Sequence, residues 1–415
     1  MTSRIHRTRC FALFAALCLI GPGVQAQVTD IGLLPGGTTC SGVAINNSGT
    51  AVAHCDDSQG RTLTVRKPLG QAFQTLLTTS QNTCRAVGIN TQNTVSANCR
   101  NDAGEFVPLR WLANLQRYTL TPIPGLLGLL PDVAATGGAI NDSDWIIGTS
   151  ISPNGQIRPV IWPGGQTAPE MLPLMTALTH GGLDAVTCEP VALDNTTVAF
   201  NGPLVAGTCS VSANGTVRSR AVLWRRTGNG GSYAVTVLDA LANADSNCSA
   251  VAIEDGGGAV AGTCTGTNDE PQAVYWAAGG TAVQSIVPSI PGGSARSTVA
   301  AMVGNLVVGS FRTSSGFEHG YAWQAPNLSF ADIGVLPGGF NSRAVGILTG
   351  AIVPIVVGVS EVGGGASHAF SWGIGQLFDG GTLGGPSSRV TGVGGGRLIG
   401  TSHVANGHEH AFIGP

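Results

Sequence analysis

The sequence predicts an all-β protein, a β-propeller of about eight four-stranded blades, with seven blades as the alternative. Three observations predict it: one pattern recurs eight times, each copy holds four short β-forming runs, and six of the seven tryptophans occupy one repeat position. Glycine contributes 62 of 415 residues, charged residues only 10% and hydrophobic residues 43%. That composition is typical of a strand-and-turn protein with an uncharged polar surface, and it is too apolar for a disordered chain.

The first element is an export signal. Three arginines precede an apolar run over 11–20, and small residues lead up to Ala26. This order is typical of a secretory signal peptide, so we expect residues 1–26 to be removed and residues 27–415 to form a single repeat domain. The apolar run is shorter than the ~20 residues of a membrane-spanning helix, which predicts no membrane span. We therefore expect a secreted protein, either extracellular or periplasmic.

Each repeat begins with two apolar runs that flank a turn such as residues 46–49, which predicts a hairpin. The apolar residue that ends the first run recurs every 44 to 60 residues, at Ile45, Ile89, Ile140, Leu193, Ile253, Met302, Ile347 and Val393. The coils of a parallel β-helix, the main alternative fold, are much shorter than this period. A pair of β-sandwiches would not contain eight equivalent units.

A third run ends in tryptophan in six of the eight repeats, and a fourth run follows it. The tryptophans are Trp111, Trp162, Trp224, Trp276, Trp323 and Trp372. We interpret them as packing residues between blades, with a sugar-binding face as the alternative. Asp30, Asp332 and Asp379 recur with the fourth run, which favours a structural hydrogen bond over catalysis.

The two ends of the chain predict that the ring closes on itself. The last repeat stops at Pro415 after its third run, while residues 28–34 form a fourth run with no three runs before it. Joined, the two ends complete one blade and remove two exposed sheet edges.

The cysteines beyond residue 26 predict four disulfides. All eight fall in four repeats, the first member of each pair five residues before the apolar anchor and the second at the end of the next run. Opposed residues of a hairpin lie within disulfide range, and export permits the bond. The expected pairs are Cys40–Cys55, Cys84–Cys99, Cys188–Cys209 and Cys248–Cys264. A zinc site, the alternative, needs more closely spaced ligands.

Residues of catalytic or metal-binding type do not form a known motif in this sequence. His403, His408, Glu409 and His410 could bind a metal, but we interpret His410 as a regular repeat residue and the other two histidines as turn residues. Lys67 is the one lysine and no basic run follows residue 26. The sequence therefore lacks the cluster of basic residues with which proteins bind nucleic acids, and we expect no nucleic-acid partner. We expect no catalytic residue set, no metal and no cofactor.

The last two repeats resemble the HAF repeats of exported bacterial proteins, which are named after a His-Ala-Phe run. One unit is carried by 379–385, 388–392, 398–400 and 409–412, and the other by 332–339 with 367–372. The position of the motif histidine holds His319, His368 and His410, but Arg158, Arg220 and Gln272 in other repeats. The resemblance implies export and repeat architecture, and it implies no activity.

Two classes of function remain. The first is a non-catalytic, monomeric binding scaffold that takes a surface glycan or another protein through its loops. The alternative is a propeller enzyme, a glycan hydrolase or lyase, with acids converging on the central channel. The fold does not choose between them. The sequence holds no unique, non-repeating cluster of acids or histidines, which favours binding.

Overall fold

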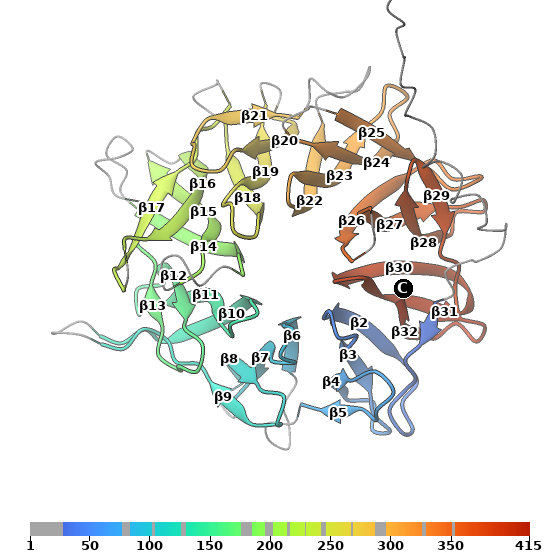
Figure 1. Ribbon diagram of the computed structural model, residues 1–415. Coiled ribbons are helices and arrows are strands. Elements are labelled where there is room, and N and C mark those ends of the chain that lie inside the picture. Colours follow the sequence, from blue (N-terminus) through green and yellow to red (C-terminus); the bar gives the residue numbers. More distant parts are fainter. Residues whose placement is uncertain are drawn as a thin grey trace, which may run out of the picture.

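The computed structural model describes residues 28–76, 84–101, 104–125, 130–175, 185–195, 202–213, 216–228, 230–241, 246–266, 269–286, 296–325, 329–350 and 353–415. These residues form a closed ring of eight four-stranded antiparallel sheets, which is an eight-bladed β-propeller (Figure 1). The predicted fold class is confirmed, and the seven-bladed alternative is wrong. The predicted signal peptide over 1–26 lies outside the described residues.

Each blade runs from an innermost strand to an outermost strand. The innermost strands are β2 (Cys40–Ile45), β6 (Cys84–Ile89), β10 (Ala134–Ile140), β14 (Ala185–Leu193), β18 (Cys248–Ile253), β22 (Ser297–Val303), β26 (Ser342–Leu348) and β30 (Gly384–Gly394). The second strands are β3 (Ala51–Asp56), β7 (Val95–Arg100), β11 (Ile146–Ile151), β15 (Val205–Ala213), β19 (Val260–Thr265), β23 (Leu306–Arg312), β27 (Ile355–Glu361) and β31 (Arg397–Val404).

The outer half of each blade completes the sheet. The third strands are β4 (Thr62–Lys67), β8 (Phe106–Trp111), β12 (Ile157–Trp162), β16 (Thr216–Arg226), β20 (Pro271–Trp276), β24 (Glu318–Gln324), β28 (Ser367–Gly373) and β32 (Glu409–Gly414). The outermost strands are β5 (Gln74–Thr75), β9 (Arg117–Thr119), β13 (Glu170–Met171), β17 (Tyr233–Val237), β21 (Val283–Ser285), β25 (Ser329–Gly334), β29 (Gln376–Asp379) and, in the last blade, β1 (Thr29–Asp30).

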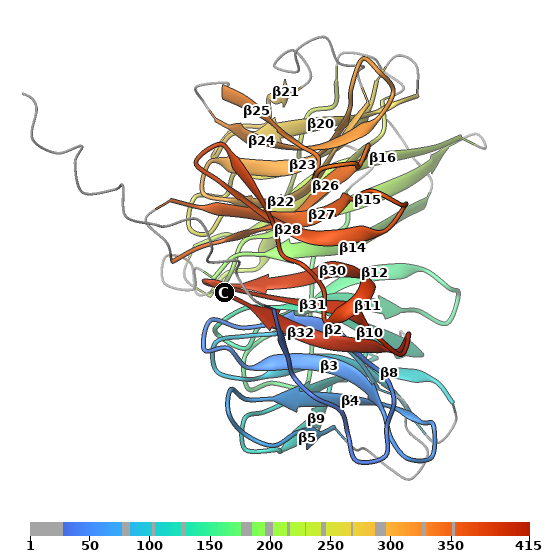
Figure 2. The ribbon, with the colours of Figure 1, turned by 90° about the vertical axis from the view of Figure 1, so that its right-hand side faces the viewer.

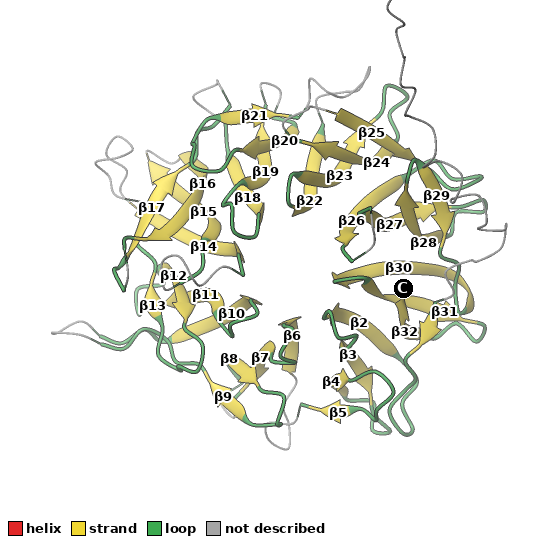
Figure 3. Ribbon diagram, in the orientation of Figure 1, coloured by secondary structure: helices red, strands yellow, loops and turns green. Residues whose placement is uncertain are grey.

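The described chain consists of strands, turns and loops, without a helix (Figure 3). No segment of this part of the chain is therefore a helix long and apolar enough to cross a membrane. The second and third strands read as short continuous apolar runs, such as Val260–Ala261 and Val274–Trp276, and both runs are buried. Neighbouring blades cover both faces of these strands, so apolar side chains are needed on both sides.

The structure pairs the eight cysteines as expected. Cys40–Cys55, Cys84–Cys99, Cys188–Cys209 and Cys248–Cys264 are disulfide-bonded, each with its Cα atoms 4.0 Å apart and directly opposed in the strand register. The hairpins are not symmetric, because a register shift follows each first cysteine, as between Gly42 and Ala44. A β-bulge of this kind adds one residue to the innermost strand and increases its local twist.

The strand ends define two faces of the ring. We call the face at which the innermost strands begin, near Cys40, Cys84, Cys188 and Cys248, the disulfide face. The opposite face, at which these strands end and turn into the second strands, is the hairpin face. The turns between second and third strands lie on the disulfide face, since each second strand runs back to it.

The chain ends close the ring as expected. Thr29 and Asp30 pair with Ile413 and Phe412, so β1 supplies the fourth strand of the blade formed by β30–β32. The paired segment is shorter than the predicted run over 28–34, with one further backbone bond from the Ile31 amide to a β32 carbonyl at 3.1 Å. Figures 1 and 2 show this blade beside the N-terminal blade β2–β5.

Candidate functional site

The repeated tryptophans lie between blades. Five of the six, all but Trp372, are at most 1% exposed, so their rings are not accessible to a sugar. The indole Nε1 of Trp162 donates a hydrogen bond to the Thr121 carbonyl of the preceding blade's connection, at 2.9 Å. Trp224 and Trp276 make the equivalent bonds across the next two blade boundaries, at 2.8 Å and 2.9 Å. These hydrogen bonds join neighbouring blades.

The repeated aspartates each contact the motif histidine of the neighbouring strand. The Nδ1 atoms of His319, His368 and His410 lie 3.0 Å, 2.9 Å and 2.7 Å from carboxylate oxygens of Asp332, Asp379 and Asp30, respectively. Each carboxylate also accepts the backbone N–H two residues further on, at 2.7 to 2.8 Å. The pairs therefore hold the third strand against the fourth and shape the turn that follows.

The C-terminal histidines lie partly in strands and partly in the turn between them. The sequence predicted a turn at His403. The residue lies in strand β31 instead, because this strand extends to Val404. Its Nε2 lies 3.9 Å from a carboxylate oxygen of Glu409, its partner in the register, while His408 is exposed in the connecting turn. Among the described residues, no three histidine, cysteine or acidic side chains are grouped closely enough to hold an ion.

Polar turn residues on the hairpin face bind one blade to the next. The side-chain amides of Asn46, Asn90 and Asn141 donate to the backbone carbonyl of the equivalent residue in the following blade, at 2.7 Å, 2.9 Å and 2.9 Å. The Asn46 side-chain oxygen accepts the N–H groups of Ser48 and Thr50 within its own turn. These amides therefore have a structural role in both the turn and the ring.

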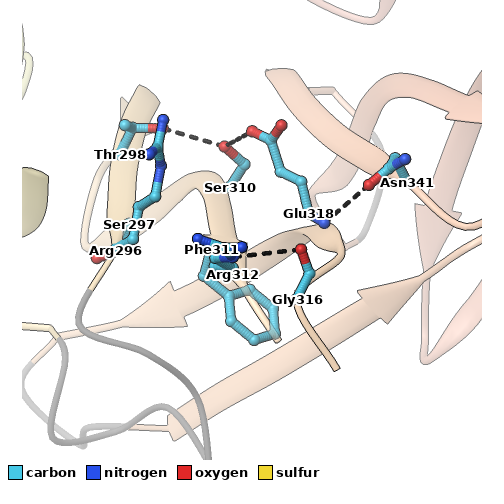
Figure 4. Close-up of a pocket in the computed structure, with 9 residues that line it drawn as sticks. All are labelled: Arg296, Ser297, Thr298, Ser310, Phe311, Arg312, Gly316, Glu318 and Asn341. Carbon is cyan, nitrogen blue, oxygen red and sulfur yellow. Dashed lines mark hydrogen bonds between the residues drawn. The ribbon is translucent and has the colours of Figure 1, made fainter. Parts of the chain in front are cut away.

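A cavity of about 410 Å³ opens on the disulfide face of the blade β22–β25. It is formed by the start of β22, the end of β23, the following turn, the start of β24 and the segment that leads into β26 (Figure 4). Its lining residues are Arg296, Ser297, Thr298, Ser310, Phe311, Arg312, Gly316, Glu318 and Asn341.

This blade departs from the repeat at the base of the cavity. The position opposite Ser297 holds Phe311, whereas the equivalent positions of the other blades hold cysteine or serine. The Phe311 ring is buried and packs edge-on against Phe330 at 5.2 Å and Tyr321 at 6.4 Å. An apolar aromatic cluster thus lies beneath a polar rim.

A hydrogen-bond network orients the rim. Ser310 lies between Thr298 and Glu318: its hydroxyl donates to the Glu318 carboxylate at 2.5 Å and lies 3.1 Å from the Thr298 hydroxyl (Figure 4). The Glu318 amide donates to the side-chain oxygen of Asn341 from the next blade, at 2.9 Å. The Arg312 Nε donates to the Gly316 carbonyl at 3.3 Å, which steadies the turn between β23 and β24.

The rim also carries an exposed aromatic pair. Phe317 and Phe340 immediately precede Glu318 and Asn341, and their rings stack with centroids 5.1 Å apart and planes 26° apart. Phe317 is 39% exposed and Phe340 is 60% exposed. Two stacked phenyl rings at the surface are unusual, because a soluble protein normally buries large apolar side chains.

The sequence did not point to the cavity. Its polar residues read as ordinary turn residues, and only Phe311 carried a signal, as the one bulky side chain at a position otherwise held by cysteine or serine. The tryptophans, aspartates and cysteines that the sequence singled out do not line this cavity.

Comparison with known proteins supports the fold class. Neither a protein family nor a curated protein matches the chain. The β-propeller domain of the Trilobed protease from Pyrococcus furiosus aligns at 9% identity and a TM-score of 0.50, over 84% of this chain and 98% of that domain. Puromycin hydrolase aligns at 11% identity and a TM-score of 0.48, over 91% of this chain and 58% of its own. At 9% identity the first of these likenesses shows a β-propeller and nothing of its activity.

Proposed function

We propose that this protein is an exported, non-catalytic binding scaffold that takes a surface glycan or another protein on its disulfide face. The proposal depends on the cavity at β22–β24, because no other blade combines an aromatic residue, an arginine and a glutamate at the positions of Phe311, Arg312 and Glu318. Thr298, Arg312 and Glu318 are replaced in the next blade by Arg343, Glu361 and Ser367, respectively. Residues that build the propeller recur from blade to blade, so a polar cavity with a combination of residues that the other blades lack is a candidate for specific recognition.

Export is part of the same proposal. Four disulfides are compatible with an oxidising compartment, and cytosolic proteins rarely keep such bonds. The signal-peptide pattern over 1–26 and the resemblance to HAF repeats support the same compartment. The signal-peptide pattern and the resemblance come from the sequence alone. Cleavage near Ala26 and the assignment of this chain to the HAF-repeat family are therefore part of the proposal.

The composition of the cavity supports binding over glycan hydrolysis. Most glycoside hydrolases use two carboxyl groups that flank the scissile bond, about 5 to 10 Å apart. Glu318 is the one carboxylate among the described residues that line the cavity, and its carboxylate accepts a hydrogen bond from Ser310. A second acid is therefore missing from the described part of this site.

The test is a binding screen that compares two variants in which a threonine is replaced by tryptophan. Thr298→Trp fills the cavity, while Thr136→Trp places the same side chain at the same repeat position of a blade across the ring. The two hydroxyls have matched surroundings, since Thr136 bonds Thr149 as Thr298 bonds Ser310. The purified exported protein is screened on a glycan array and against cell-envelope proteins, and bound glycans are checked for cleavage.

We expect a ligand that binds the unmodified protein and Thr136→Trp, and that loses binding with Thr298→Trp. Release of cleaved sugar would instead support the enzyme alternative. Equal binding by both variants would place the binding surface outside the cavity and contradict the proposal.

A further inference from the structure

We propose that the cavity at β22–β24 binds an acidic sugar, a uronic-acid unit of a polysaccharide, through its arginines and the stacked phenylalanines on its rim. This inference rests on the proposed binding function and names its ligand class. Three independent features carry it: the charge of the cavity, its hydroxyl and amide groups, and the exposed aromatic pair.

Two arginines and one carboxylate line the cavity, in a protein of negative net charge. Arg296 and Arg312 contribute two guanidinium groups against the single carboxylate of Glu318, whereas the whole chain has a formal net charge of −3. The Glu318 carboxylate is engaged by Ser310, a neighbour on the adjacent strand. The planar guanidinium fork matches a carboxylate in a bidentate geometry, which makes arginine the residue suited to this group.

The uncharged groups of the rim suit a ligand with many hydroxyls. The Thr298 hydroxyl can donate or accept a hydrogen bond, while the Ser310 hydroxyl, which donates to Glu318, can accept one from a sugar hydroxyl. Asn341 is held in place by Glu361, whose carboxylate accepts from its side-chain amide at 2.9 Å and from its backbone amide at 3.1 Å. A fixed amide beside the cavity is a preorganised partner, because little side-chain freedom is lost on binding.

The aromatic pair provides the apolar half of the site. A pyranose ring carries C–H groups on its faces, and these pack against exposed aromatic rings. Phe317 lies between the lining residues Gly316 and Glu318, and Phe340 precedes Asn341, so the pair stands on the turn and the connection that form the cavity. A free phosphate or sulfate has no such face and would leave the pair without a role. An acidic peptide shares the carboxylate, and the experiment distinguishes it.

The experiment measures binding by titration calorimetry with defined probes. These are tetrasaccharides of galacturonate, glucuronate and mannuronate, the same three after reduction of their carboxyl groups, and tetraglutamate. The variants are Arg312→Ala and Phe340→Ala. Their controls are Arg85→Ala, an exposed arginine of the disulfide face across the ring, and Phe378→Ala, an exposed phenylalanine of β29.

We expect at least one uronate to bind about tenfold more tightly than its reduced form, and Arg312→Ala to remove most of that difference. Phe340→Ala should weaken the uronate and its reduced form alike, since it removes the stacking surface and not the charge. Arg85→Ala and Phe378→Ala should leave both affinities unchanged.

Three results would overturn the inference. Equal affinity for a uronate and its reduced form would remove the role of the carboxylate. Tight tetraglutamate binding that depends on Arg312 but not on Phe340 would assign the cavity to an acidic peptide. If no uronate binds while Thr298→Trp abolishes binding of another ligand, the ligand class is wrong and the binding function stands. If no ligand responds to Thr298→Trp, the binding function itself fails.

Discussion

At the scale of single residues, one position on the second strand connects four of the eight blades to the blade that follows. In β3 this residue is His54, whose Nε2 accepts the Ala86 amide of the following blade at 3.2 Å. Asn98, Thr208 and Thr401 occupy the same repeat position and accept the equivalent amide of the blade that follows, at 2.8 Å, 3.2 Å and 3.2 Å. In β27 the equivalent residue is Val359, so not every blade has this bond. Where the bond forms, the side chain must accept it, which a histidine does only in its neutral form.

This requirement predicts a pH-dependent stability. Burial lowers the pKa of His54 below its ordinary value of 6.5, and the charge of Arg85 lowers it further. The unfolded chain then binds the proton more readily than the folded chain. His54 therefore makes its full contribution to the free energy of unfolding above about pH 6.5. That contribution is lost as the pH falls from there through the lowered pKa.

The variant His54→Asn has the residue that the next blade holds at this position, Asn98. Its melting temperature should depend less on pH than that of the unmodified protein. Melting temperatures measured from about pH 7.5 to about pH 5 should fall more for the unmodified protein than for the variant. The other histidines are common to both proteins, so their titration cancels in the comparison. Parallel profiles would show that His54 does not need to be neutral in the folded state.

At the scale of the element, the innermost hairpin exists in versions with and without a disulfide. Opposed serines, Ser342 with Ser360 and Ser388 with Ser402, occupy in two blades the positions that cysteine pairs hold in four others. Both serine pairs are buried. The hairpin thus forms without the covalent bond, which implies that the disulfide adds stability to an element that strand pairing already specifies.

Replacing Cys248 and Cys264 together by serine should leave the fold intact with a lower melting temperature. The bond closes a loop with a sequence separation of 16, which corresponds to about 3 kcal/mol in the chain-entropy model. Thermal denaturation under non-reducing conditions measures the loss. Cys248→Ser alone leaves a thiol that can exchange with the other disulfides, and non-reducing electrophoresis should show more mispaired protein than for the double variant. Identical behaviour of the two would contradict this account.

At the scale of the whole molecule, the ring is held together by its two chain ends. The Asp30 carboxylate contacts His410, and Ile31 and Leu34 join an apolar cluster that contains Val65 of the first blade and Ala411 of the last. The N-terminal segment therefore supports two blades at once. It also covers the edge of β32, which would otherwise expose unpaired backbone groups.

Deletion of residues 28–37 should therefore destabilise both blades. Amide hydrogen exchange should increase over 388–413 as well as over 40–70, because the first segment loses its paired edge and the second its packing. Asp30→Asn is the matched control, since it keeps the strand and should change exchange far less. Loss of protection over 40–70 alone would mean that the last blade does not depend on β1.

Much of this fold could be predicted from the sequence because its determinants are local. The opposed cysteines lie 15 to 21 residues apart, and strand pairing within one hairpin decides their register. Eight similar units that each need a neighbour to bury their faces predict a closed ring, and the incomplete ends predicted where it closes. The bulges in the innermost strands were not predicted, since they depend on sheet twist.

The candidate site was decided by the tertiary structure. Arg312 and Glu318 come from β23 and β24, and Arg296 comes from the residue just before β22. Asn341 comes from the connection to the next blade, and Phe317 meets Phe340 across that boundary. In the sequence each is a solitary residue near a turn, with nothing to mark its neighbours. The sequence by itself determined the repeat, the disulfides and the closure, because these follow from pairing within and between equivalent strands. Which polar residues share a cavity depends on how one atypical blade packs around Phe311, and only the folded ring brings them together.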